Sequence, residues 1–443
     1  MFSNNPQDYW HRVRDEDFTN DLDLSRPERT IPLVFHCDGV KIFKTQKAWV
    51  YSYSSMIKKK HGSLANKMVF LIVREAALVK YRTHDEVARL VGYCCKTLAT
   101  GCYPLLDVDG NAFEEQSLEA LRAGQPFTTA GWRACFCGFK SDLEARVQVH
   151  KMVRNYMANN ICEHCCAGKE IPYTDFTEGA AWKLCRFTHK EFLMMNPSSR
   201  QSGWVQVPGW RKERNLEDLL HTLHLGVAGC AVAGLLIDHL QCKCPALTLD
   251  GLERELARAY GHYRAWCRGN RQSGSCLKFT RLRFGREKWS SLPELSQYKA
   301  STVKLMMYWL QVFLMEDGDP PGHEDRKYCA YSLVMFQWML DVTGSWFNPA
   351  SARETADFGF AFLLFYQRLA LKCQDAEKRC YKITPKFHYF CHLCEYIEKG
   401  YRNVRREFTQ LSFQQNQCGE SPTSLFKLHF VCCPFLKLFK EID

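Results

Sequence analysis

Three β-rich segments, 31–43, 48–57 and 68–78, follow one another with only short polar connections between them. Their β-branched and aromatic residues favour strands, and the short connections favour antiparallel neighbours. A helix is expected next, over 85–98, because Thr83 and Glu86 have the spacing of a capping box. The segment 132–139 is predicted to be a fourth, buried strand, and a second helix is expected over 143–157.

The order strand, strand, strand, helix, strand, helix is that of the first half of an RNase H-like fold. After about residue 160 the chain consists mainly of long segments with helical periodicity. We therefore predict an α/β protein with an RNase H-like mixed sheet and a large, mainly helical insertion. The expected units are a flexible N-terminal arm (1–30), the first half of the core (31–158), a helical insertion with a zinc knuckle (159–380) and the C-terminal part of the core (381–443).

Composition indicates the environment of the protein. The N-terminal residues lack the apolar stretch of a signal peptide, so an intracellular location is expected, with reduced thiols among the 23 cysteines. The longest apolar stretch, Leu225–Ile237, is shorter than the about 20 residues that span a bilayer, so no membrane segment is expected. The net charge of +11 is compatible with a polyanionic partner.

Two aspartates are expected to lie close together in this strand order. Asp38 lies inside the first strand, and a buried carboxylate there is costly unless it binds a metal or is paired. Asp142 ends the fourth strand, which neighbours the first in an RNase H-like sheet, so the two carboxylates could bridge Mg²⁺. Simpler interpretations are open for both: Asp38–Gly39 as a turn, and Asp142 as a helix cap.

Asp218 and His221 have D-x-x-H spacing on one helical turn of the segment NLEDLLHTLHLGV. This segment resembles the C/D-x-x-H signature of eukaryotic cut-and-paste DNA transposases such as hAT and CACTA (En/Spm), and is most similar to the CACTA version. Other segments follow in the order found in those transposases: Asp38–Gly39, the cysteine cluster 161–166, HKEFL at 189–193, and TPKFHYFCHL at 384–393, which resembles a Pro-Lys-x-His-x-x-x-His stretch. The resemblance spans about residues 31–430.

The resemblance implies a third acid late in the chain, after residues 384–393. Glu420 is preferred because it follows a polar break and precedes an amphipathic segment, and Glu395 and Glu407 are its rivals. Asp38, Asp142 and Glu420 would then hold two Mg²⁺ or Mn²⁺ ions about 4 Å apart. Asp218 and His221 would lie beside that site.

A second kind of metal site is expected in the insertion. Cys162 and Cys165 have Cys-x-x-Cys spacing, and Cys185 with His189 follows about 20 residues later, a span suited to a structural Zn²⁺ site. His164 and Cys166 are alternative ligands. CACTA-like transposases have a cysteine pair at this place, so the resemblance also implies a zinc knuckle.

The function implied by the resemblance is DNA strand cleavage and transfer by two-metal-ion phosphoryl transfer, in the nucleus, with a homo-oligomer left open. Two basic and aromatic segments, 204–215 and 277–289, would contact DNA, or else form loop rims anchored by tryptophan. Two other interpretations remain open. One is a domesticated or decayed transposase that only binds DNA or protein, and the other is an unrelated cysteine-rich zinc scaffold.

Overall fold

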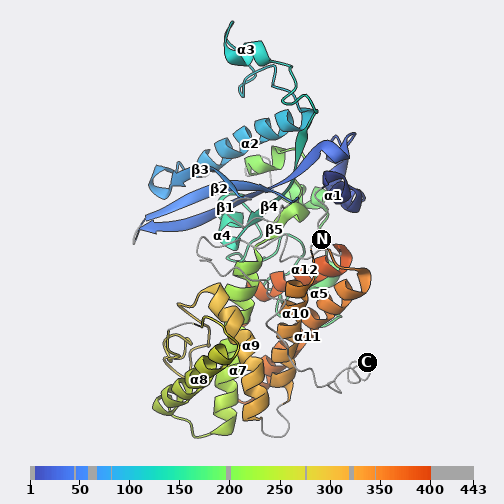
Figure 1. The fold of residues 1–443 in the computed structure, drawn as a ribbon. Helices are drawn as coiled ribbons and strands as arrows, with labels where there is room; N and C mark the ends of the chain where they lie inside the picture. The colour runs from blue at the N-terminus through green and yellow to red at the C-terminus, as the bar shows by residue number, and fades with distance from the viewer. Residues whose placement is uncertain are drawn as a thin grey trace.

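The computed structural model describes residues 5–43, 46–57, 67–80, 82–195, 201–274, 277–318, 324–344 and 346–400. Five strands form one mixed sheet in the order β3-β2-β1-β4-β5 (Figure 1). The first three are antiparallel neighbours, and the last two run parallel to β1. Their bounds are Thr30–Phe43 (β1), Gln46–Ser55 (β2), Met68–Arg74 (β3), Arg133–Ser141 (β4) and Asn215–Glu217 (β5). The four predicted strands and the mixed α/β class are confirmed.

Helices cover both faces of the sheet. Helix α2 (Arg82–Thr100) packs Val87 and Val91 on one face, and it includes the predicted helix 85–98. Helix α1 (Pro6–Val13) packs Trp10 and Val13 against the other face. Alternate residues of β4 point to these two faces, so the strand is buried on both sides.

The expectation of a flexible arm over residues 1–30 is wrong for α1. Tyr9, Trp10 and Val13 are spaced to lie on one side of a helix, and all three are buried. Asn5 caps the helix by accepting a hydrogen bond from the Gln7 amide, and the Trp10 indole donates to the Thr30 carbonyl at 2.6 Å. The sequence did not predict this helix because many charged residues surround its short apolar stripe.

The helix expected over 143–157 is much shorter than predicted. Helix α4 (Leu143–Gln148) ends where the amides of Val149 and His150 both donate to the Ala145 carbonyl. Lys151 then adopts a left-handed conformation with φ of 52°, which turns the chain away from the helix axis. This turn lets residues 161–167, called the cysteine loop below, pack beside α4.

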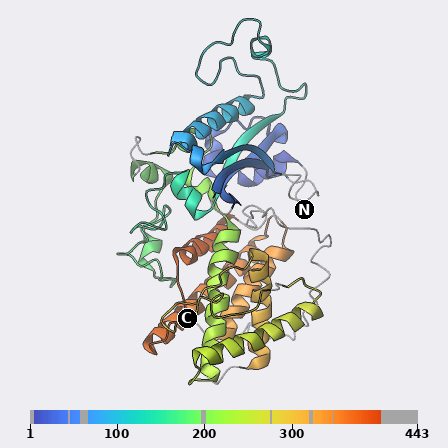
Figure 2. The ribbon, with the colours of Figure 1, turned by 90° about the vertical axis from the view of Figure 1, so that its left-hand side faces the viewer.

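A bundle of long helices lies beneath the sheet (Figures 1 and 2). Helix α7 is buried along nearly its whole length, so the predicted helical core is confirmed. The bounds are Ala228–Lys243 (α7), Leu249–Gly269 (α8), Ala300–Asp317 (α9), Asp325–Val342 (α10), Pro349–Asp375 (α11) and Pro385–Gly400 (α12). Three further short α-helices are Leu118–Arg122 (α3), Ala181–Leu184 (α5) and His189–Met195 (α6).

A π-helical segment, Leu220–Val227, connects β5 to α7, and α12 packs against it. Helix α12 therefore lies at the junction between bundle and sheet, as Figures 1 and 2 both show. The helix Leu220–Lys243 is long and apolar enough to cross a membrane by length and composition alone, but most of it is buried inside the protein, as a core helix is.

Candidate metal centre and acid site

Three aspartates lie at one level on three neighbouring parallel strands: Asp38 inside β1, Asp142 directly after β4 and Asp218 directly after β5. Cys37 of β1 is the register partner of Ser141 in β4, and Ser141 is the partner of Glu217 in β5. Asp38, Asp142 and Asp218 each follow one of these partners, so they occupy the same level across the sheet, about one inter-strand spacing apart. The structure thus brings together the predicted pair and Asp218, which the sequence placed only beside the site.

Electrostatic effects link these side chains. Burial raises the pKa of Asp142, and the carboxylate of Asp38 raises it further. Burial alone would lower the pKa of His221, but the carboxylates of Asp218, Asp142 and Asp38 outweigh it and raise that pKa. His221 Nδ1 is hydrogen-bonded to Asp218 Oδ2. The His221 ring therefore lies among three carboxylates that favour its charged form.

Two lysines are close enough to interact with the same carboxylates. Burial lowers the pKa of Lys67 even though Asp38 and Asp218 favour its charged form. Burial likewise lowers the pKa of Lys386, which also interacts with Asp142 and Asp218. The sequence analysis did not identify either lysine, because their neighbours are far away in the chain. Both could offset the negative charge of the acids or contact a phosphate.

The simpler interpretations of the two predicted acids have different outcomes. The Asp38–Gly39 pair is not a turn, because Asp38 pairs with Val50 in the β1–β2 ladder and β1 continues to Phe43. Asp142 does cap α4, since its Oδ1 accepts from the Ala145 amide at 2.7 Å. Capping uses one carboxylate oxygen, so it is compatible with metal binding through the other.

The third acid is not placed by the structure. Glu420 and its rival Glu407 lie outside the described residues. The other rival, Glu395, lies in α12, where it pairs with Arg186 and His392. Within the described part of the chain, Asp38, Asp142 and Asp218 do not belong to any group of three or more ligand atoms that all lie within 4.8 Å of one another.

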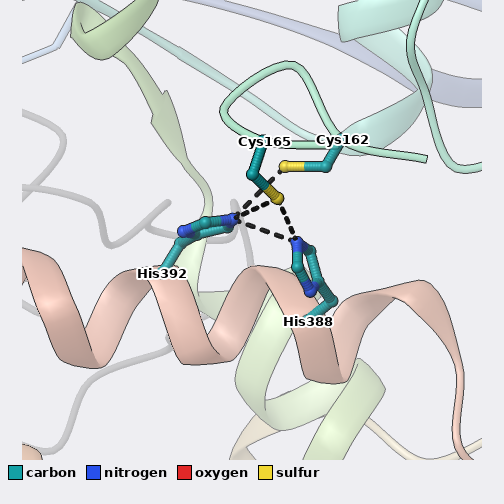
Figure 3. Close-up of side chains that lie close together, drawn as sticks. All are labelled: Cys162, Cys165, His388 and His392. Atoms are coloured by element: carbon teal, nitrogen blue, oxygen red, sulfur yellow. Dashed lines mark hydrogen bonds between the residues drawn. The ribbon is translucent and has the colours of Figure 1, made fainter. Parts of the chain in front are cut away.

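Four buried ligand atoms do converge in another place. Cys162 and Cys165 of the cysteine loop face His388 and His392 of α12, and their ligand atoms lie within 4.8 Å of one another (Figure 3). We call these four residues the Cys/His group. Nε2 of His392 lies 3.3 Å from the Cys162 sulfur and 3.0 Å from Nε2 of His388, which is itself 3.3 Å from the Cys165 sulfur.

These separations suit a tetrahedral ion. Zn–S bonds of about 2.3 Å and Zn–N bonds of about 2.0–2.1 Å at tetrahedral angles imply sulfur–nitrogen separations of about 3.6 Å and nitrogen–nitrogen separations of about 3.3 Å. Two thiolates and two imidazoles, all buried, form a common donor set for structural zinc. The Cys/His group therefore fits Zn²⁺ by ligand type, number and spacing.

Electrostatic effects also couple the members of the group. Burial raises the pKa of Cys162 to about 11, whereas a hydrogen bond from Cys162 lowers the pKa of Cys165. Burial alone would lower the pKa of His392, but Cys162 and Glu395 raise it to about 9. Because cysteine and histidine bind a metal only through deprotonated atoms, an ion at this group would displace the protons that the ligands hold.

His392 also has polar partners on its second ring nitrogen. Its Nδ1 lies 3.1 Å from Glu395 Oε2 and 2.9 Å from Arg186 Nη1. A carboxylate on the far nitrogen of a metal-binding imidazole fixes the ring and raises its basicity. Glu395 is therefore placed to orient a metal ligand.

The Cys/His group shares only two of its four residues with the zinc ligand set predicted from the sequence. Cys162 and Cys165 are brought together with two ligands from α12, and not with Cys185 and His189. The Cys185 carbonyl accepts from the Cys166 amide, and the His189 ring lies tilted against Trp210 with the ring centroids 5.8 Å apart. The spacing His-x-x-x-His on one helical face was the available signal, but it lies more than 200 residues after the cysteines.

Two other buried groups of possible ligands already contain an arginine. Asp238, Cys373 and Cys380 lie together, but Arg326 Nη1 is 2.7 Å from Asp238 Oδ2. Glu163, His164 and Glu217 form the second, and Arg146 pairs with both carboxylates. Because a guanidinium balances the charge in each, neither is a strong candidate for a metal. His164, an alternative zinc ligand in the sequence analysis, belongs to the second group.

The first of the two predicted basic segments is largely buried. Trp204 and Trp210 are core residues, and the cations Lys212 and Arg214 are at most 3% exposed. Arg214 donates from Nε to the Cys137 carbonyl at 2.6 Å. Tryptophan does anchor 204–215 to the core, as the alternative interpretation expected, but Lys212 and Arg214 are buried and do not form an exposed loop rim. In 277–289 the exposed cations are Lys278 and Lys288.

No disulfide joins the cysteines in the part of the chain that the structure describes. Comparison with models of known protein families finds none that matches this chain, and comparison with curated proteins finds no significant match.

Proposed function

We propose that this chain has an RNase H-like core and descends from a cut-and-paste transposase that cleaves and transfers DNA strands. The observation that carries the proposal is that Asp38 of β1 lies at the same level across the sheet as Asp142 and Asp218, which directly follow β4 and β5. The strand order β3-β2-β1-β4-β5, with three antiparallel and then two parallel neighbours, supports the same fold. The D-x-x-H segment then begins directly at the acid site.

In this function Asp38 and Asp142, with a later acid such as Glu420, would hold two Mg²⁺ or Mn²⁺ ions. Such ions activate an attacking water or 3′-hydroxyl and stabilise the leaving oxygen. Carboxylate oxygens are the ligands that these hard ions prefer. Asp218 raises the pKa of His221 and holds its ring in place, and in its charged form the imidazolium would donate a hydrogen bond to a phosphate oxygen.

Nicking of supercoiled plasmid DNA in Mn²⁺ tests the proposal. The unaltered protein should nick the plasmid, and Asp38→Ala and Asp218→Asn should each reduce the rate by at least about 100-fold, because each removes a group required at the reacting phosphate. Glu119→Gln, an exposed acid of α3 far from the site, is the matched control and should cut normally. If Asp38→Ala cuts as fast as the parent protein, the three-acid site is not the source of the activity.

A protein that binds DNA but never nicks it would instead support the non-catalytic, domesticated or decayed transposase. Filter binding or gel shift on the same plasmid separates this outcome from a loss of folding. The third acid is tested in the same assay: Glu420→Gln should abolish nicking and leave DNA binding intact. If Glu407→Gln abolishes it and Glu420→Gln does not, the third acid must be reassigned.

We further propose that the Cys/His group binds one structural Zn²⁺. Support comes from the four buried donors and their tetrahedral spacing. Metal analysis of the purified protein should find about one zinc per chain, and a Cys162→Ser/His388→Ala variant should lose it. Cys185→Ser, which alters the other predicted ligand, should retain the zinc. Loss of zinc from Cys185→Ser alone would return the site to the ligand set first predicted.

A further inference from the structure

A buried ion network joins the cysteine loop to the two elements that carry Asp142 and Asp218. Arg146 lies in α4, four residues after Asp142, and is only 1% exposed. Its guanidinium pairs with Glu163, which lies between the two cysteines of the loop. On the other side its Nη2 is 3.1 Å from Glu217 Oε1 and donates to the Asn215 carbonyl at 2.6 Å.

The same network reaches α12. Tyr389 lies between the two histidines of the Cys/His group, and its hydroxyl is 2.8 Å from Glu163 Oε2 and 2.7 Å from the Ile161 carbonyl. The Arg146 guanidinium stacks over the Tyr389 ring at 5.3 Å. His164 lies 3.3 Å from Glu217 Oε1. The loop, α4, β5 and α12 therefore meet at one buried guanidinium.

The ion network is also connected to Asp142 and Asp218. Asp142 is the first residue before α4, and its carbonyl accepts from the Arg146 amide at 3.1 Å, while Asp218 directly follows Glu217, a partner of the Arg146 guanidinium. Asp218 is also tied to β4 through its amide, which donates to the Ser141 carbonyl at 3.3 Å. A buried ion pair contributes little net stability compared with apolar packing, but it fixes geometry because each charge must keep its partner.

We propose that Arg146 is a positioning residue that couples metal occupancy of the Cys/His group to the placement of Asp142 and Asp218. The metal would hold the cysteine loop in place, and the loop would hold Glu163 against Arg146. When the loop loosens, Arg146 loses Glu163 and keeps only its β5 partners, Glu217 and the Asn215 carbonyl, so the contact between α4 and β5 is no longer held from the side of the loop. The inference rests on the proposed zinc site and on the proposed acid site.

Hydrogen exchange measured by mass spectrometry on the full chain tests the coupling. In the parent protein, removal of zinc by a chelator should speed amide exchange in 142–148 and 215–218 by at least about fivefold, the lower end of coupling between sites. Helix α8 (Leu249–Gly269), which does not contact the network, is the internal reference. In Arg146→Lys the two segments should exchange faster even with zinc bound, and zinc removal should add little.

Arg154→Lys is the matched control. Arg154 also holds the cysteine loop, by donating to the carbonyls of Cys162, Cys165 and Ala167, but no contact described for it reaches α4 or β5. This variant should respond to zinc removal as the parent does. If Arg146→Lys does not fold, Tyr389→Phe replaces it, since loss of one hydroxyl from the network should weaken the response while preserving the fold.

Three results overturn the inference: no response to zinc removal in the parent, an equal response in the parent and in Arg146→Lys, or a protein that takes up neither zinc nor Co²⁺. Calorimetric titration with Mn²⁺ separates this inference from the acid-site proposal. Coupled exchange without Mn²⁺ binding would contradict the acid-site proposal and leave the coupling intact. The opposite result would contradict the coupling alone: the parent protein binds Mn²⁺, Asp142→Asn does not, and zinc removal leaves the exchange of the two segments unchanged.

Discussion

His392 has partners on both of its ring nitrogens, and this distinguishes it from the other histidine of the Cys/His group. Nε2 faces the Cys162 sulfur, and Nδ1 faces Glu395 and Arg186. Because Arg186 also pairs with Glu395, the carboxylate is itself held in place. The ring orientation required for a metal bond is thus set before a metal arrives.

Glu395→Gln should therefore weaken zinc binding by about 10- to 100-fold, the usual effect of losing an outer-shell carboxylate. Competition with a colour-forming chelator measures the affinity. Glu398→Gln, on the same helix and outside the group, is the control and should bind zinc as the parent does. Equal affinities for parent and Glu395→Gln would mean that Glu395 does not orient the His392 ring for metal binding.

At the scale of single residues, the sequence predicted two of the four members of the Cys/His group. Cys162 and Cys165 are recognisable because both ligands of a Cys-x-x-Cys pair are local. The partner ligands are chosen by tertiary contact, and local spacing favoured Cys185 and His189, which the structure leaves apart. The ion pairs of Arg146 with Glu163 and Glu217 could not be predicted either, because no residue near Arg146 in the chain indicates them.

At the scale of elements, the strands were predictable and the helix ends were not. β1 to β4 are runs of β-branched and aromatic residues between polar breaks, so pattern alone defined them. β5 has only three residues, too few to show any period, and its position beside β4 places Asp218 in the site. α4 ends early through backbone geometry at Lys151, which no apolar pattern reveals.

Asp142 combines a structural role with a proposed catalytic one, and two substitutions separate them. Asp142→Asn keeps a good helix cap, so its free energy of unfolding should stay within about 0.5 kcal/mol of the parent, while Mn²⁺-dependent nicking is lost. Asp142→Ala should lose nicking and also about 1 kcal/mol of stability, because the Ala145 amide loses its acceptor. Urea unfolding monitored by circular dichroism gives the stabilities. Nicking by Asp142→Asn at the parental rate would leave Asp142 as a cap only.

For the whole molecule, acid stability depends on contacts between helices of the bundle. Asp317, at the end of α9, lies 2.8 Å from both His239 Nε2 and Lys243 Nζ of α7, and 3.4 Å from Arg258 Nη1 of α8. Burial alone would raise the pKa of Asp317, but these partners hold it at about 2, below its ordinary value of 3.8. One carboxylate therefore joins three helices.

Because the folded pKa is the lower one, the stabilisation from Asp317 is present above about pH 4 and is lost as the pH falls towards 2. Asp317→Asn should lower the free energy of unfolding by about 1 kcal/mol at neutral pH and flatten its dependence on pH in that window. Urea unfolding from pH 2 to 7 measures both effects. The adjacent exposed acid, in Glu316→Gln, is the control, and a similar change in both variants would contradict the assignment.

The Cys/His group joins distant parts of the chain, since Cys162 and His392 are 230 residues apart in sequence. An ion bound there would fasten the cysteine loop to α12 and so connect the sheet to the last described helix of the bundle. Binding to the folded state alone stabilises it by about 4 kcal/mol when free zinc is 1,000 times the dissociation constant. The resulting cross-link also reduces the conformational freedom of the unfolded chain if the ion stays bound, although this term grows only slowly with loop length.

Removal of zinc should therefore lower the thermal midpoint of the whole protein by several degrees, and not only loosen the loop. Differential scanning calorimetry with and without a chelator measures the shift. Cys162→Ser should begin at the lower midpoint and show no further shift with the chelator, because it lacks a ligand. Cys94→Ser, which alters an exposed cysteine of α2, should behave as the parent does. If the chelator shifts Cys162→Ser as much as the parent, the stabilising ion is bound elsewhere, and the link between sheet and bundle must rest on packing alone.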